Sequence, residues 1–198
     1  MVTAAGRQLT EQHRRTQLAL RAVTIRDMMA LWPAFDLDGI DRTWPPLQAA
    51  LVTLILARRA NSSGIAANYY RSLRTAEGVP GRPEPRLAPP PDRTLLTATL
   101  ALVGPIQAKK NLTARRPDVA ATTLVRLSGS VTRQVLDGGR KTLEVSTRAD
   151  PRARGWRRVT SASPCDFCAG IASEGIHSEG GGFPAHDHCG CAAAPVFD

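Results

Sequence analysis

Apolar residues recur at helical spacing through most of the first two thirds of this 198-residue chain. In the N-terminal part, one stripe repeats at intervals of three and four residues, which predicts one face of a helix. It consists of Leu18, Ala22, Ile25, Met29 and Trp32. Pro33 and the acidic turn at 36–41 are expected to end this helix. We expect His13, a lone histidine near its start, to lie on the surface.

A second helix is expected to begin near the Trp-Pro-Pro sequence at 44–46, because proline fits the first turn of a helix. Gly64 is a point at which this helix could bend or break. Its apolar stripe contains Leu47, Leu51, Leu54, Ile55, Ile65, Tyr69 and Leu73. Of the neighbouring Tyr69 and Tyr70, we expect one in the core and one at its rim. Stacking of these rings on nucleic-acid bases is the alternative.

The Pro-rich segment 78–92 predicts a stiff, extended surface connection between two helical parts. Asp92 is placed to cap the next helix, and Gly104-Pro105 should interrupt the end of that helix. Its apolar positions are Leu95, Leu96, Leu102, Val103 and Ile106, with Thr99 in the same stripe.

A last helical stripe precedes a change of period. The stripe consists of Ala120, Leu124, Leu127, Val131 and Val135. We expect Asp137-Gly138-Gly139 to supply the C-cap. Apolar residues then alternate at Leu143 and Val145, which predicts a short strand, and Trp156 and Val159 indicate a second strand.

These elements predict a mainly α fold. A helical body, residues 1–139, contains the Pro-rich connection 78–92, and a small C-terminal α+β module, residues 140–198, is stabilised by zinc. The sequence has no apolar run long enough to span a membrane, and its start turns polar where a signal peptide needs an apolar core. We therefore expect no membrane partner and synthesis in a reducing cytosol, which favours metal-bound or free thiols over disulfides.

The C-terminal segment Cys165–Cys191 contains all four cysteines and three of the four histidines. Its spacing is C-x2-C, then a Gly-rich span, then H-x-H-C-x-C, and converging thiolates and imidazoles suit tetrahedral zinc. A structural site with about one Zn²⁺ per chain is the leading interpretation. A catalytic zinc is less favoured, because the ligands suffice to fill all four positions. Unrelated buried thiols and thioredoxin-like redox chemistry are the alternatives, although the βαβ setting of the latter is missing.

The residues of this segment differ in how firmly the spacing assigns them. Cys165 and Cys168 are the safest ligands, and His186 with Cys189 would complete the tetrahedron. Cys191 and His188 are competitors for the last positions, since alternate residues of C-x-C can face one ion.

The net charge of +9 is unevenly distributed. Residues 101–160 carry +9, whereas residues 161–198 carry −5 and contain no Lys or Arg. The basic block indicates a surface for nucleic acid or an acidic protein, with a solvated Arg-rich surface as the alternative. Its candidate contact residues are Lys109, Lys110, Arg115, Arg116, Arg152, Arg154, Arg157 and Arg158. Since the cysteine segment contains no Lys or Arg, we expect its metal to stabilise the fold of the segment, and we do not expect the segment to bind DNA as a zinc finger does.

Three stretches of this sequence together resemble a known family: NYYRSLRTAEGVPG from residue 68, LDGGRKTLEVSTRADPRARGWRRVTSASPCDFCAGIAS, and FPAHDHCGCAAAPVF. They are similar to the phage Mu F-like minor capsid, or head-morphogenesis, proteins, in the branch from phages of actinobacteria. The family's His-Pro-x-Cys-x-Cys type signature corresponds to His186, Cys189 and Cys191. Asp187 replaces its proline, and Gly190 replaces a frequent arginine.

The resemblance implies a structural, non-enzymatic virion protein that associates with portal, capsid or scaffold protein in head assembly and genome delivery. It further implies a place inside the capsid or near the portal, with possible non-specific contact to packaged DNA. Some relatives are described as capsid maturation proteases, which is the alternative function. No convincing catalytic set accompanies it, and the test residues would be Ser161 and His186. A free nucleic-acid-binding zinc protein is the third hypothesis.

Overall fold

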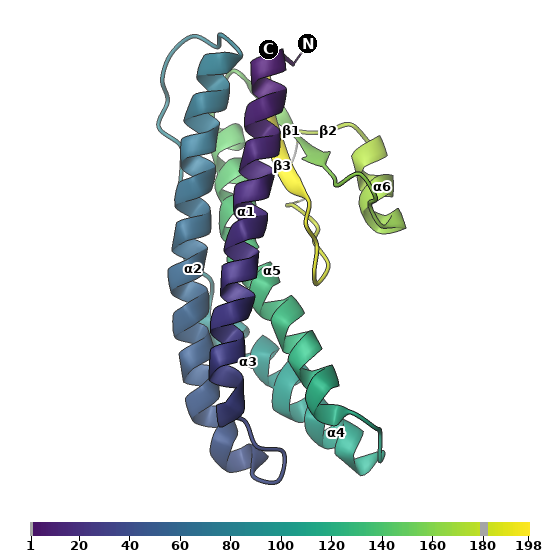
Figure 1. Ribbon diagram of the computed structural model, residues 1–198. Coiled ribbons are helices and arrows are strands. Elements are labelled where there is room, and N and C mark those ends of the chain that lie inside the picture. Colours follow the sequence, from purple (N-terminus) through teal and green to yellow (C-terminus); the bar gives the residue numbers. More distant parts are fainter. Residues whose placement is uncertain (1, 179–181) are drawn as a thin grey trace.

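The computed structural model describes residues 2–178 and 182–198, and its architecture is mainly helical with a small C-terminal sheet, as predicted. Two long antiparallel helices, α1 (Ala4–Leu31) and α2 (Ile40–Ala76), lie side by side (Figure 1). The 3₁₀ turn η1 (Trp32–Ala34) lies between them. The long helix α5 (Val119–Ala149) packs against both α1 and α2.

The helical segments between the Pro-rich connection and α5 lie at one end of this assembly. Helix α3 (Arg93–Ala101) continues through a π-helical turn, η2 (Leu102–Ile106), into α4 (Gln107–Thr113). Asp92 caps α3 as predicted, accepting hydrogen bonds from the backbone N–H groups of Thr94 and Leu95. The π turn lies where Gly104-Pro105 was expected to interrupt the helix.

A three-stranded antiparallel sheet with the strand order β2-β1-β3 packs on the C-terminal half of α5. Its strands are β1 (Ala153–Val159), β2 (Ile176–His177) and β3 (Ala192–Phe197), with α6 (Asp166–Ser173) inserted between β1 and β2. The strand predicted at Trp156–Val159 is thus confirmed. In β3, Pro195 lies opposite Trp156. Within the described residues, no helix is long and apolar enough to cross a membrane.

The sequence-based prediction for α5 was wrong at its C-terminal end. Asp137-Gly138-Gly139 does not cap the helix, and Leu143 and Val145 lie in the same helix rather than in a strand. The glycines serve packing instead: a Cβ on Gly138 would lie 2.5 Å from the carbonyl oxygen of Arg59 in α2. The expected division after residue 139 therefore falls inside α5.

The buried face of α1 also differs from the predicted stripe. Ala22 and Met29 are exposed, whereas the buried positions are Gly6, Thr10, His13, Gln17, Leu20, Thr24 and Met28, four of which are polar. Gln17 explains the difference, because its amide exchanges hydrogen bonds with Ser62 of α2 at 2.9 and 3.0 Å. Thr10, Gln17 and Thr24 have hydrogen-bond partners for their buried polar groups. Apolar periodicity alone misses such a face.

Helix α2 begins earlier than predicted and runs unbroken through Gly64. Its first residue, Ile40, packs with Ala108 and Val119, so tertiary contacts fix the additional turn. Tyr69 and Tyr70 are both buried, which corrects the expectation of one core and one rim residue. The 78–92 connection contains neither helix nor strand.

A buried ion pair joins the end of α2 to the end of α5. Arg74 donates to Asp150 from Nε at 2.6 Å and from Nη2 at 3.2 Å, and the two side chains are 6% and 1% exposed. Tyr70 donates to the same carboxylate at 2.7 Å. Although burial raises the pKa of Asp150, the hydrogen bonds from Arg74 and its neighbours lower it overall. The guanidinium also donates to carbonyls at the start of the Pro-rich connection, including that of Gly81 at 2.6 Å.

Replacing Arg74 by Met should lower the free energy of unfolding by about 3–5 kcal/mol, because Asp150 would be left charged and buried without its partner. The control is Arg71→Met, which removes an exposed pair to Glu84 and should cost under about 1 kcal/mol. Urea denaturation of both variants measures the difference. Equal losses would show that the pair at Arg74 is no more important than a surface pair.

His13 is buried and stacks on Tyr69, with 4.3 Å between the ring centroids, so the predicted surface position was wrong. Burial lowers its pKa to about 4, against about 6.5 in an unfolded chain. The unfolded chain therefore binds the proton more tightly. The contribution of neutral His13 to stability is complete above about pH 6.5 and is lost as the pH falls toward 4.

We expect His13→Phe, which keeps an aromatic ring against Tyr69, to remove this part of the acid sensitivity. Between pH 7 and pH 4, the free energy of unfolding of the variant should gain up to about 3 kcal/mol relative to the parent. Denaturant titrations at each pH measure this shift. Parallel pH profiles of the two proteins would contradict the assignment.

Candidate metal centre

The C-x2-C pair lies at the start of α6. Cys165 is the residue immediately before this helix and Cys168 lies in its first turn, so both sulfurs face one side. The Cys165 side chain is exposed, whereas Cys168 is buried. The backbone N–H of Cys168, which faces the Cys165 sulfur, lowers the pKa of the Cys165 thiol, while burial raises the pKa of Cys168.

The second half of the site comes from the loop before β3. His186 Nε2 lies 3.2 Å from Cys165 Sγ and 3.4 Å from Cys168 Sγ, and Cys189 Sγ lies 3.8 Å from Cys168 Sγ. Two groups of ligand atoms, each within 4.8 Å, could hold a metal ion: Cys165, Cys168 and His186, and Cys168, Cys189 and Cys191. Cys168 belongs to both.

These spacings have the size of a tetrahedral site. With Zn–S distances of about 2.3 Å and Zn–N of about 2.0 Å, two ligand sulfurs are separated by roughly 3.8 Å and a sulfur and a nitrogen by roughly 3.5 Å. The donor set of thiols and one imidazole likewise fits a soft divalent ion. Each of the two groups therefore has the size of a metal site, and the two groups share Cys168.

The His186 ring is oriented for this role. Its Nδ1 lies 2.6 Å from the carbonyl oxygen of Asp187. Because a carbonyl only accepts, Nδ1 carries the hydrogen, and the Nε2 lone pair is directed at the sulfurs. The hydrogen bond to Asp187 and the neighbouring thiolates raise the pKa of His186, against the opposing effect of burial.

Cys189 and Cys191 differ in charge. A hydrogen bond from the Cys191 thiol lowers the pKa of Cys189 to about 4, aided by the charge of Arg140. The same hydrogen bond, together with burial, raises the pKa of Cys191. Cys189 is therefore the more acidic thiol of this pair and the readier metal ligand.

His188 faces away from the cluster. It has a positive φ of 64°, and its carbonyl accepts a hydrogen bond from Arg21 of α1 at 3.0 Å. A Cβ on Gly129 of α5 would lie 2.8 Å from His188 Nε2, so the ring packs against that helix. The loop is thus divided. His186 and Cys189 face the sulfurs at the start of α6, while Asp187 and His188 between them contact the helical body.

Two buried arginines adjoin the sulfurs, and the sequence analysis missed their role. Arg158 Nη1 lies 3.6 Å from Cys168 Sγ and 3.8 Å from Cys189 Sγ, and its guanidinium stacks on Phe183 at 4.0 Å from the ring centroid. Arg140 donates to the carbonyls of Cys189 and Cys191. The two-residue period of a strand could have revealed the burial of Arg158. Arg158 is two residues from Trp156 and shares its buried face of β1.

The predicted basic block does not form one surface. Arg158 is buried against the cysteines and is unavailable to a partner, which corrects its assignment as a contact residue. Lys109 and Lys110 lie in α4, and Arg115 and Arg116 lie in the connection that leads into α5. Arg152, Arg154 and Arg157 lie beyond the end of α5. Helix α5 has 31 residues and is roughly 46 Å long at 1.5 Å per residue, and this length lies between Arg116 and Arg152 along the chain.

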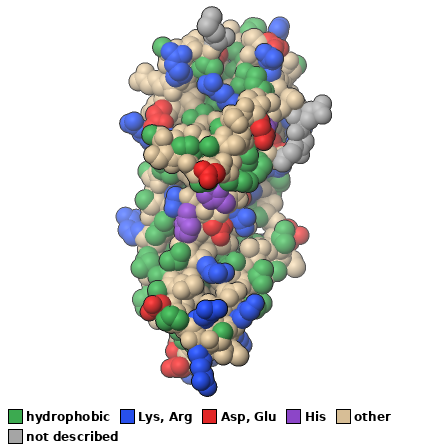
Figure 2. All heavy atoms as spheres, turned by 90° about the vertical axis from the view of Figure 1, so that its right-hand side faces the viewer, with side chains coloured by type: hydrophobic (Ala, Val, Ile, Leu, Met, Phe, Trp, Pro, Cys, Tyr) green, Lys and Arg blue, Asp and Glu red, His purple; other side chains and the backbone are tan. Residues whose placement is uncertain are grey.

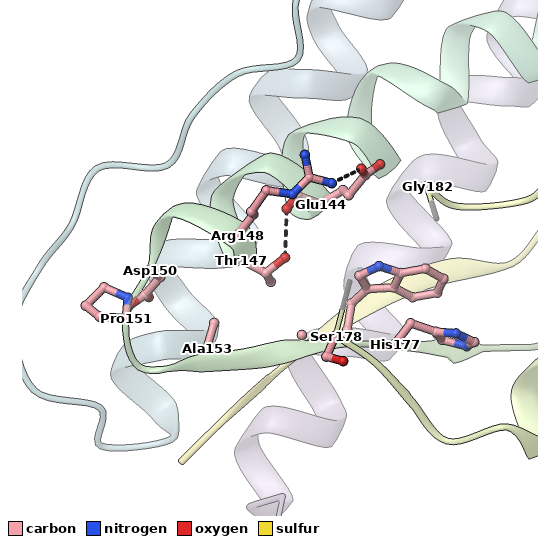
Figure 3. A pocket seen from close by; sticks show the side chains of 11 residues that line it. Glu144, Thr147, Arg148, Asp150, Pro151, Ala153, His177, Ser178 and Gly182 are labelled. Carbon is pink, nitrogen blue, oxygen red and sulfur yellow. Dashed lines mark hydrogen bonds and ion pairs between the residues drawn. The ribbon is translucent and has the colours of Figure 1, made fainter. Parts of the chain in front are cut away.

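A cavity of about 180 Å³ lies between the end of α5 and the strands β1 and β2 (Figure 3). Glu144 in its wall accepts hydrogen bonds from Lys141 and Arg148 at 2.9 and 2.8 Å, so its charge is balanced. His177 stacks on Trp156. Among the described residues, no hydrogen bond joins His177 to Ser178 here, or His186 to Ser161 at the cysteine cluster.

The fold and the site together define a mainly helical protein whose small C-terminal sheet carries a Cys/His cluster able to hold a metal. Over residues 4–198 the chain matches the family described as VG15 protein, so it belongs to this phage-associated family. No curated protein and no solved structure matches it. The phage association expected from the sequence is thereby confirmed.

Replacing Arg158 by Gln should weaken metal binding by roughly 10- to 100-fold, because a thiolate-rich site would lose its neighbouring positive charge. Arg157→Gln, in the adjacent position of β1 and directed to the other face, is the matched control and should bind as the parent does. Competition with a chromophoric chelator measures both affinities. Equal affinities would remove Arg158 from the surroundings that tune the site.

Proposed function

We propose that this chain is a structural minor capsid protein of a tailed phage that acts in head morphogenesis without enzymatic activity. Membership of the phage-associated VG15 family over nearly the whole chain carries the proposal. The Cys/His cluster supports a structural role, because the two groups that share Cys168 together offer enough thiols and imidazole to occupy all four positions of a tetrahedral ion and leave none for substrate. Zn²⁺ is the metal that this donor set and these spacings favour.

In this role the zinc ion stabilises the C-terminal module, and the partner contacts are made elsewhere. The expected partners are the portal protein and a capsid or scaffold protein. The protein would be made in the host cytoplasm and then reside in the virion, in the capsid interior or near the portal. Non-specific contact with packaged DNA would use the exposed basic side chains at both ends of α5, including Arg115, Arg116, Arg152 and Arg154.

The purified protein should contain about one zinc per chain, held by Cys165, Cys168, His186 and Cys189. Cys168→Ser should abolish binding, since Cys168 belongs to both groups of ligand atoms. Cys191→Ser is the matched variant and should retain the metal, because Cys191 lies outside the four proposed ligands. Elemental analysis and the visible spectrum of the Co²⁺ form measure these outcomes. A folded, metal-free protein with four titratable thiols would contradict the zinc site.

The virion role predicts that the chain copurifies with portal protein when the two are co-expressed, and that mass spectrometry detects it in purified particles. Major capsid protein co-expressed with it should stay intact. Cleavage that is lost in Ser161→Ala or His186→Ala would instead establish the maturation protease. Absence from purified particles would exclude a structural virion component.

A further inference from the structure

One face of the helical segment Arg93–Thr113, which we call the arm, exposes large aliphatic side chains. Leu95, Leu102 and Ile106 are 67%, 60% and 55% exposed. They occupy positions i, i+7 and i+11, which lie along one stripe of a helix. The stripe is about 16 Å long at 1.5 Å per residue. Only small or polar residues, such as Ala98 and Thr99, lie between them along this face.

The opposite face holds the arm rigidly on the body. Leu96, Leu100 and Ala108 are buried, and Gln48 of α2 donates to the carbonyl of Thr97 at 2.9 Å. At the π turn, a Cβ on Gly104 would lie 2.7 Å from the Trp44 ring, so the backbone is pressed against α2. The exposed stripe is therefore a fixed feature of the fold, and a partner would bind a surface that needs no ordering.

The charged residues of the arm and of the four residues that follow it are all basic. Residues 93–117 contain Arg93, Lys109, Lys110, Arg115 and Arg116, and no Asp or Glu. Within the described part of the chain, only Lys109 among them has an ion pair, to Asp41 of α2. Figure 2 shows Lys and Arg side chains gathered over the lower part of the molecule, where α4 and the start of α5 lie. An apolar stripe thus ends in unneutralised positive charge.

We propose that the arm docks an amphipathic helix of a partner protein whose apolar stripe is flanked by Asp and Glu. Large side chains separated by small ones match the ridges and grooves of a second helix, and the acidic flanks would meet Lys110, Arg115 and Arg116. Nucleic acid is disfavoured as the partner, because its charged phosphate backbone offers no apolar group to pack on three aliphatic side chains. A membrane surface is disfavoured because residues 93–117 contain no aromatic side chain to sit at the interface.

This inference deepens the proposed function, because it names the face and the chemistry through which a virion partner would bind, and it rests on that function for the source of the helix. A peptide experiment tests the face alone. If the peptide does not bind, the docking proposal fails while the proposed virion role still stands. If the chain is absent from purified particles, the virion role fails while the docking proposal still stands.

The probe is a designed, fluorescently labelled amphipathic peptide with a leucine stripe at positions i, i+4, i+7 and i+11 and flanking glutamates. Its control has lysine at every glutamate position. Fluorescence anisotropy with the full-length, zinc-loaded protein should show binding of the acidic peptide that weakens with added salt, and at least about tenfold weaker binding of the lysine peptide.

Two sets of variants place the binding on the arm. Leu102→Ser with Ile106→Ser should weaken the acidic peptide at least about tenfold, as should Lys110→Glu with Arg115→Glu. The controls are Leu87→Ser, which removes an exposed leucine from the Pro-rich connection, and Arg152→Glu with Arg154→Glu at the far end of α5; neither should change the affinity. Circular dichroism verifies that each variant is folded.

Three results would overturn the proposal. The first is no measurable binding of the acidic peptide, and the second is peptide binding that the arm variants leave unchanged. The third is arm-dependent binding to a membrane or to DNA in place of the acidic peptide. For the last, the same variants are tested with phosphatidylglycerol vesicles and with a short DNA duplex. Arm-dependent binding to either one without binding of the acidic peptide would replace the partner helix with a membrane or with DNA.

Discussion

The buried pair between Arg74 and Asp150 is the interaction on which the joining of the helical body and the C-terminal sheet depends. Asp150 directly follows α5 and precedes β1, so fixing its carboxylate fixes the direction in which the chain enters the sheet. The same guanidinium holds the start of the Pro-rich connection and lies over the ring of Phe197 in β3. One desolvated cation thus orders four segments that are far apart in sequence, and its burial is tolerated because nearly every donor has an acceptor.

The helical content could be predicted from the sequence, but several boundaries could not. Asp92 and the Gly104-Pro105 interruption have local causes, a cap and a missing N–H, and both were found where expected. Gly138 and Gly139 carry a signal that is typical of a helix end, yet here they allow α2 and α1 to approach α5. The sequence shows that a residue is a glycine. Whether that glycine ends a helix or allows two helices to pack closely depends on residues distant in the chain.

The Cys/His cluster was predictable as far as spacing determines it. The C-x2-C pair and the His186–Cys189 pair converge as their separation suggested. Their surroundings were not predictable, because Arg140 and Arg158 look like surface charges until the sheet folds onto α5. The same folding removed Arg158 from the basic block, and α5 divided what was left. A run of like charges in sequence therefore does not define a surface when a long helix lies within it.

The composition of the small sheet has a consequence for self-association. A sheet usually grows at its edges, where unpaired backbone groups recruit strands from other molecules. Here β2 has only two residues, and β3 contains Pro195, which has no N–H to donate. Neither edge offers a long backbone template. Crowded copies of this chain are thereby protected from strand exchange and fibril-like stacking, and any ordered assembly would have to be built from side-chain surfaces.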